Sequence, residues 1–142
     1  MGRAWGTIAA MALVAGCMAR EPADRDAVAP VSMGAEIYAQ DCAACHGAAA
    51  RGDGPAAAGL DPAAPPDLTA IAARNGGDFP LAEVMSTIDG YTEDGSTHER
   101  AMPEFGADLS GRTVLFDTGD GIPTPTPEWL VALGTYLQSI QD

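Results

Sequence analysis

The sequence predicts a mainly α-helical domain with a small β-hairpin before its last helix. The last helix is indicated by apolar residues that recur three and four positions apart near the end of the chain: Leu130, Leu133, Leu137 and Ile140. The same spacing occurs in mid-chain, at Leu81, Val84, Met85 and Ile88. Such spacing gathers apolar side chains on one face of a helix. Between these helices, Thr113–Phe116 suits a strand and Asp117–Gly121 suits a turn, which together favour a hairpin.

The first two expected helices begin at residues that can cap a helix. Ser32 can cap a first helix that we expect to run to about Cys42. A loop rich in Gly, Pro and Ala, without periodicity, follows over residues 47–66. Asp67 can then cap a short helix over residues 68–74, which Asn75-Gly76 would end.

The next two expected helices are bounded by proline and glycine. Pro80 suits the first position of a helix that we expect to reach Asp89 and to stop at Gly90. A loop over residues 91–101 follows it. Thr126 can cap the last helix, and Pro127 then stands at its first position, where a missing N–H costs little.

Large apolar side chains are scarce in this chain of 142 residues. It has 28 alanines, whereas Leu, Ile, Val and Phe together number 24, about 17% of the chain. This profile, with a net charge of −13, is typical of disordered proteins. Folding must offset about 1–2 kcal/mol of backbone entropy per residue. We therefore expect that part of the chain is disordered or that something other than side chains fills its core.

The charged residues exclude one class of partner. Acidic residues outnumber basic ones 20 to 7, and all seven basic residues are arginine. Nucleic acid is bound chiefly through Lys and Arg contacts to its phosphates. Because no basic patch is available, we expect no nucleic-acid partner.

The first 17 residues resemble a bacterial export signal with a lipid attachment site. Arg3 precedes the apolar run Thr7–Ala15, whose nine residues are far fewer than the roughly 20 that span a bilayer. Such a run is typical of a secretory signal peptide. Leu13–Cys17 resembles a bacterial lipobox, which implies cleavage after Gly16 and a lipid on Cys17. An ordinary signal peptide cut nearby, with Cys17 incidental, is the alternative.

Three regions follow from this interpretation. We expect a lipoprotein signal peptide at residues 1–16, a lipid-anchored flexible tether at residues 17–31 and one domain at residues 32–142. The tether is rich in Ala, Pro and charged residues, and it would reach on the order of 20 Å from the anchor. A lipid on Cys17 also explains the odd number of cysteines, three. The expected location is the periplasmic side of a bacterial membrane.

Cys42-Ala43-Ala44-Cys45-His46 has the C-x-x-C-H spacing of c-type haem attachment. Two cysteines on one helical turn can reach the two vinyl groups on one edge of a porphyrin, and His46 can then bind the iron. The alternatives are a thioredoxin-like redox pair and half of a zinc site. A thioredoxin-like pair normally follows a strand, and no strand is predicted before Cys42. A zinc site needs a second pair of ligands, and His98 is the only other histidine.

Around this motif the chain resembles the class I cytochrome c family, over roughly residues 32–140. The residues that carry the resemblance further are Gly34, Tyr38, Gly47, Gly54, Pro55, Leu133 and Tyr136. In the family, a glycine lets the first and last helices cross closely. The resemblance implies helices and loops wrapped around one covalently bound haem c. It also implies that the Pro55 carbonyl accepts the Nδ1–H of the axial histidine.

Met102 is the predicted sixth ligand of the iron. It stands in Ala101–Gly106, which resembles the family's Met-Pro-x-Phe segment, and the proline after it disfavours a helix. Met85 lies on the apolar face of an expected helix and is predicted to be a core residue. His98 is the alternative ligand and would give a bis-histidine haem. Two further methionines, Met18 and Met33, lie in the tether and at the start of the first helix.

A haem with a histidine and a methionine ligand has no open position on its iron. The soft thioether raises the reduction potential relative to bis-histidine ligation. We therefore expect an electron carrier, not an enzyme, and no small-molecule substrate. Arg100, two residues from Met102, is the first candidate to pair with the haem propionates, ahead of Arg74 and Arg112.

The acidity of the chain predicts a redox partner with a basic docking surface. Mitochondrial-type cytochromes c dock through a ring of lysines, and this chain has no lysine with which to do so. An acidic face that is merely solvated is the alternative. Two other functions stay open: a haem c subunit of a larger oxidase or dehydrogenase, and a haem enzyme or gas sensor with a labile sixth ligand.

Overall fold

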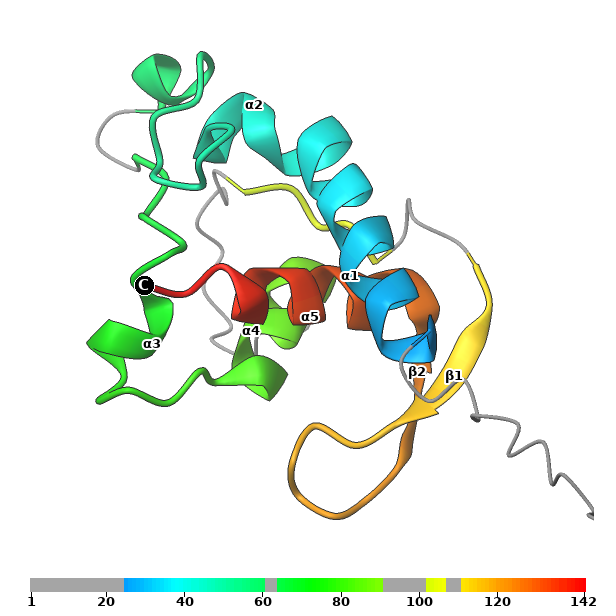
Figure 1. Ribbon diagram of the computed structural model, residues 1–142. Coiled ribbons are helices and arrows are strands. Elements are labelled where there is room, and N and C mark those ends of the chain that lie inside the picture. Colours follow the sequence, from blue (N-terminus) through cyan, green and yellow to red (C-terminus); the bar gives the residue numbers. More distant parts are fainter. Residues whose placement is uncertain (1–24, 61–63, 91–101, 107–110) are drawn as a thin grey trace, which may run out of the picture.

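The computed structural model describes residues 25–60, 64–90, 102–106 and 111–142 (Figure 1). The elements follow in the order α1 (Arg25–Ile37), η1 (Tyr38–Cys42), α2 (Ala43–His46), η2 (Ala57–Gly59), α3 (Ile71–Arg74), α4 (Leu81–Asp89), β1 (Thr113–Phe116), β2 (Thr124–Pro127) and α5 (Glu128–Ser139). η1 is a π-helical turn and η2 is a 3-10 turn. The described chain is therefore largely helical with one small antiparallel sheet, as predicted. Among the described helices, none combines the length and the apolar character needed to cross a membrane.

The first helix begins earlier than predicted. α1 starts at Arg25 instead of Ser32, so the backbone of residues 25–31 is helical. The proline of this segment, Pro30, favours irregular structure, but the alanines Ala27 and Ala29 are strong helix formers, and the segment is helical. Residues 1–24 lie outside the described residues. The signal peptide and the lipid on Cys17 therefore stay predictions.

α1 and α5 cross closely at a glycine (Figure 1). Gly34 of α1 is buried against the backbone of Ala132 in α5. A Cβ atom at position 34 would lie 2.6 Å from the carbonyl carbon of Ala132 and 2.7 Å from the Cβ of Tyr136. No larger residue fits without moving one helix. The crossing that the family resemblance implied is thus confirmed.

Two predicted helix starts are wrong. The helix α3 begins at Ile71, because Asp67 folds into a turn of its own instead of capping a helix over residues 68–74. The Asp67 Oδ1 accepts hydrogen bonds from the Thr69 N–H (2.9 Å) and the Thr69 hydroxyl (2.7 Å). Thr126 and Pro127, the expected cap of the last helix, end strand β2, and α5 begins at Glu128.

The end of α4 agrees with the prediction, whereas its first helical residue is Leu81 and Pro80 precedes it as the N-cap. It ends at Asp89, and Gly90 closes it in the left-handed conformation (φ 90°), where its N–H donates to the Ser86 carbonyl. Glycine adopts this conformation without the steric cost that other residues meet.

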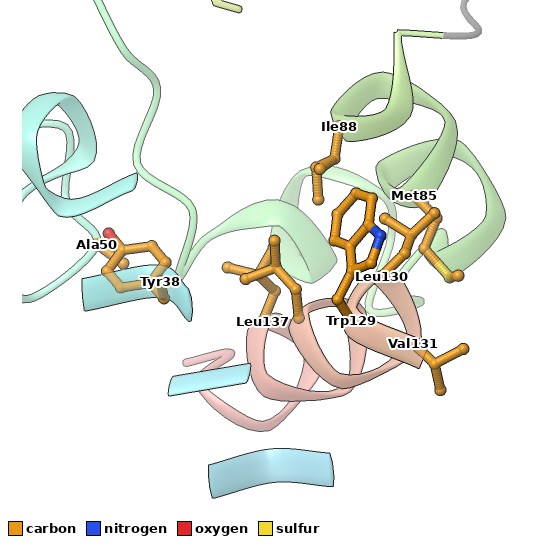
Figure 2. Close-up of a cluster of buried hydrophobic side chains, with 9 residues drawn as sticks. Tyr38, Ala50, Met85, Ile88, Trp129, Leu130, Val131 and Leu137 are labelled. Atoms are coloured by element: carbon orange, nitrogen blue, oxygen red, sulfur yellow. The ribbon is translucent and has the colours of Figure 1, made fainter. Parts of the chain in front are cut away.

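The core lies between α4, α5 and the end of the first helical segment (Figure 2). Its buried members are Tyr38, Ala50, Met85, Ile88, Trp129, Leu130, Val131, Leu133 and Leu137. Met85 is 4% exposed, which confirms its predicted place in the core. Both apolar stripes read from the sequence therefore face inward, except that Leu81, Val84 and Ile140 are half-buried.

The predicted hairpin is present and projects from the start of α5 (Figure 1). β1 and β2 pair antiparallel, with Thr113 opposite Pro127 and Phe116 opposite Thr124. Phe116 packs against the core, as does Val114, whereas Leu115 is 73% exposed. At the turn, an oxygen of the Asp117 carboxylate accepts the N–H groups of Gly119 (2.8 Å) and Gly121 (3.0 Å).

Candidate cofactor site

A cavity of about 510 Å³ brings the predicted attachment and ligand residues together: Cys42, Cys45, His46 and Met102. This volume is within the range of about 300–1,000 Å³ that is usual for cofactor pockets. Apolar side chains from well-separated parts of the chain complete the wall, among them Leu68, Ile88, Phe105, Leu133 and Leu137. Met102 and the C-x-x-C-H motif, distant in sequence, thus face the same space.

The local helical structure presents the motif to this cavity. Cys42 ends the π-helical turn η1, and Cys45 and His46 lie in α2. π-helical turns inside helices are frequent at functional sites. No pattern in the sequence predicts this turn. The buried Tyr38 hydroxyl donates to the Gly47 carbonyl at 2.6 Å. This bond links the chain before the motif to the residue directly after it. Burial raises the pKa of Tyr38 to about 12, so the phenol keeps the proton that this bond requires.

The Cys42 thiol is held in its protonated form in the chain without an attached group. Burial, and then the negative charge of Asp41, raise its pKa to about 11. Asp41 and Glu83 are exposed acidic residues that line the cavity. Arg74 is an exposed basic residue that lines it too.

His46 is arranged as a neutral ligand. Burial lowers the pKa of its imidazole, which favours the uncharged form that binds metals. Its Nδ1 is buried and makes no hydrogen bond of normal geometry. The Pro66 carbonyl faces the imidazole at a looser geometry and offsets part of the effect of burial. The Pro66 carbonyl is therefore the group that can fix the orientation of the His46 imidazole.

The prediction that Pro55 plays this part is not supported. Pro55 is exposed and does not line the cavity. The residues on either side of Pro55 are hydrogen-bonded to α2. The Gly54 N–H donates to the Cys45 carbonyl (3.1 Å), and the Ala56 N–H donates to the Ala44 carbonyl (2.9 Å). The loop approaches His46 only at Pro66. Which of the two prolines lies near the imidazole is therefore decided by the path of the loop.

The loop that carries Pro66 is held by the last residues of the sequence. The Gln141 side chain donates to the Leu68 carbonyl (2.9 Å). The Asp142 N–H donates to the Thr69 carbonyl (3.0 Å). Arg51 forms an exposed ion pair with Asp142 at 3.1 Å. These bonds join distant segments, so no local pattern in the sequence reveals them.

Met102 lies half-buried on another wall of the cavity and packs against the core. Its segment is fixed to α4 by a hydrogen bond from the Phe105 N–H to the Ile88 carbonyl, at 3.1 Å. His98, the alternative ligand, and Arg100, the first candidate to pair with the propionates, lie outside the described residues. Among the candidates for the propionates, Arg74 lines the cavity, whereas Arg112 pairs with Glu128 and does not.

A sequence model of the Cytochrome c family matches residues 31–111. The chain therefore belongs to the cytochrome c family. Membership implies a covalently attached haem c and a function in haem-based electron transfer, and members of the family are typically electron carriers. No curated protein and no solved structure matched the chain.

The residues of the cavity fit such a group. The wall is mostly apolar, as a porphyrin requires, and both cysteines of the attachment motif face it. Burial lowers the pKa of the His46 imidazole and so favours its neutral form, and Nδ1 is buried, which leaves Nε2 as the nitrogen that could bind iron. Met102, whose thioether sulfur is a soft donor, lines the same cavity.

The hydrogen bond from Tyr38 to Gly47 is expected to stabilise the haem-loaded protein. Tyr38→Phe should lower the free energy of unfolding by about 0.5–1.5 kcal/mol, because one hydrogen bond is lost while Gly47 still accepts from Ala50. Denaturant unfolding measures this. Tyr136→Phe is the matched control, since the Tyr136 ring packs against Tyr38 in a tilted arrangement, with 5.3 Å between the ring centroids. Equal effects of the two substitutions would contradict a specific role for the Tyr38 hydroxyl.

Proposed function

We propose that the chain carries single electrons through one haem c, attached at Cys42 and Cys45 and ligated by His46 and Met102. The observation that carries this proposal is that all four side chains line one cavity. Bound haem supplies an iron that accepts an electron and returns it. The protein would keep both ligands in place in the two oxidation states and exclude water from the iron.

Three features of the chain support this role. Gly47, next to His46 in the chain, accepts the hydrogen bond of the Tyr38 hydroxyl, and the Pro66 carbonyl interacts with the imidazole. Phe105, three residues after Met102, is bound to α4. The wall between them is apolar and admits few polar groups that could bind substrate. Two axial ligands from the protein leave no open position for chemistry on the metal, which favours a carrier over a haem enzyme or gas sensor.

We further propose that the carrier is exported and tethered by a lipid on Cys17 at the periplasmic side of a bacterial membrane. Its support is the resemblance of residues 1–17 to a lipoprotein signal. The net charge of −13 supports a redox partner with a basic docking surface, which could belong to a larger oxidase or dehydrogenase. The exposed Asp41 and Glu83 on the rim of the cavity would face such a partner.

Replacing the proposed sixth ligand tests the function. Met102→Ala should keep the haem attached but abolish the weak red charge-transfer band of Met–Fe ligation. The reduction potential should fall, and the reduced form should bind CO. Optical spectra and a redox titration measure these changes. Met85→Leu removes a buried core methionine and should leave the band unchanged. An unaltered spectrum in Met102→Ala would show that another residue is the ligand.

The anchor and the acidic docking surface can be tested by washing membranes at increasing ionic strength. The native protein should stay with the membrane at every salt concentration, because a lipid anchor is insensitive to screening. Cys17→Ser should be retained only at low salt, where a basic partner holds it, and released as salt rises. Retention of Cys17→Ser at high salt would contradict the anchor. Its release already at low salt would contradict the charged partner.

A further inference from the structure

The segment that carries Met102 lies directly against the end of α4. The Phe105 N–H donates to the Ile88 carbonyl at 3.1 Å, and both residues line the cavity. Each of the two segments has a glycine next to this contact. Gly90 closes α4, and Gly106 ends the described part of the methionine segment.

Neither glycine leaves room for a side chain. A Cβ atom at position 106 would lie 2.7 Å from the backbone oxygen of Asp89. A Cβ atom at position 90 would lie 2.7 Å from the Cγ and 2.9 Å from the Cβ of Glu104. Real Cβ atoms do not approach other atoms this closely, so a methyl group at either position must push the two segments apart.

Met102 is displaced only if its own segment, and not α4, is the one that moves. Gly106 is four residues from Met102, and the Phe105–Ile88 hydrogen bond lies between the glycine contact and the methionine. Ile88 is 5% exposed and belongs to the core, so α4 is the fixed side of the contact. The methionine segment, with Pro103 and Glu104 exposed, is the side that can move.

We propose that Gly90 and Gly106 are positioning residues for the sixth ligand: their lack of a side chain lets the segment of Met102 lie on the end of α4 and sets how far the thioether reaches into the cavity. This inference rests on the proposed ligation by Met102. A methyl group at position 106 would then weaken the Met–Fe bond while the haem stays attached through Cys42 and Cys45.

Competition by imidazole for the ferric iron measures how firmly Met102 is held. Gly106→Ala should bind imidazole about tenfold or more tightly than the native protein, and its red charge-transfer band should weaken. Gly59→Ala is the matched control, because a Cβ there meets nothing within 4 Å and neither glycine has a positive φ. It should leave imidazole affinity unchanged. Should Gly106→Ala fail to accumulate with haem, Gly90→Ala takes its place, with Gly121→Ala as the control of similar φ (81° against 90°).

The Met102→Ala background separates positioning from a general loss of stability. Once the ligand is removed, Gly106→Ala should no longer change imidazole affinity, because no methionine is left to displace. A persisting increase in this background would overturn the inference. So would equal affinities of Gly106→Ala and Gly59→Ala while Met102→Ala itself binds imidazole more tightly. If Met102→Ala does not raise the affinity at all, the proposed ligation fails and the inference fails with it.

Discussion

The close crossing of α1 and α5 at Gly34 is the constraint on which the rest of the site depends. Because Gly34 has no side chain, α1 lies on the backbone of Ala132, and the two helices pack closely along their crossing. The segment beyond α1 then carries Tyr38 and Cys42 to one wall of the cavity, while α5 supplies Leu133 to another. A displacement of either helix would change both walls at once.

The two proposed ligands are held by different kinds of contact. His46 is fixed over a short stretch of chain, by α2 and by the Tyr38 hydroxyl on Gly47. Met102 is fixed from far away in sequence, by the packing of its segment on α4. The histidine side should therefore withstand local disturbance, whereas the methionine side depends on contacts between segments far apart in sequence. A carrier needs both, because a ligand that comes and goes with oxidation state slows electron transfer.

The sequence predicts best what is local. The stripe in α5, the helix α4 and the C-x-x-C-H motif are patterns within a few residues of each other, and the structure bears out their placement. Met102 is predicted from the resemblance of its segment to Met-Pro-x-Phe and from the proline after it; the structure puts it on the cavity wall, and its binding to iron stays a prediction. Other contacts join segments that are far apart in sequence, so no local spacing predicts them. They are the approach of Pro66 to His46, the hydrogen bonds of Gln141 and the packing of Gly106 on Asp89. The early start of α1 was missed because alanine and proline in the same segment favour opposite structures.

The scarcity of large apolar residues is explained if haem completes the core around the cavity. The most direct test is the folding of a chain that cannot attach it, Cys42→Ala with Cys45→Ala, followed by circular dichroism and denaturant titration. Met102→Ala, which keeps both cysteines, serves as the haem-loaded comparison. We predict that the double variant is largely unfolded and shows no cooperative transition. Native-like helix content with a cooperative transition in that haem-free chain would contradict the account.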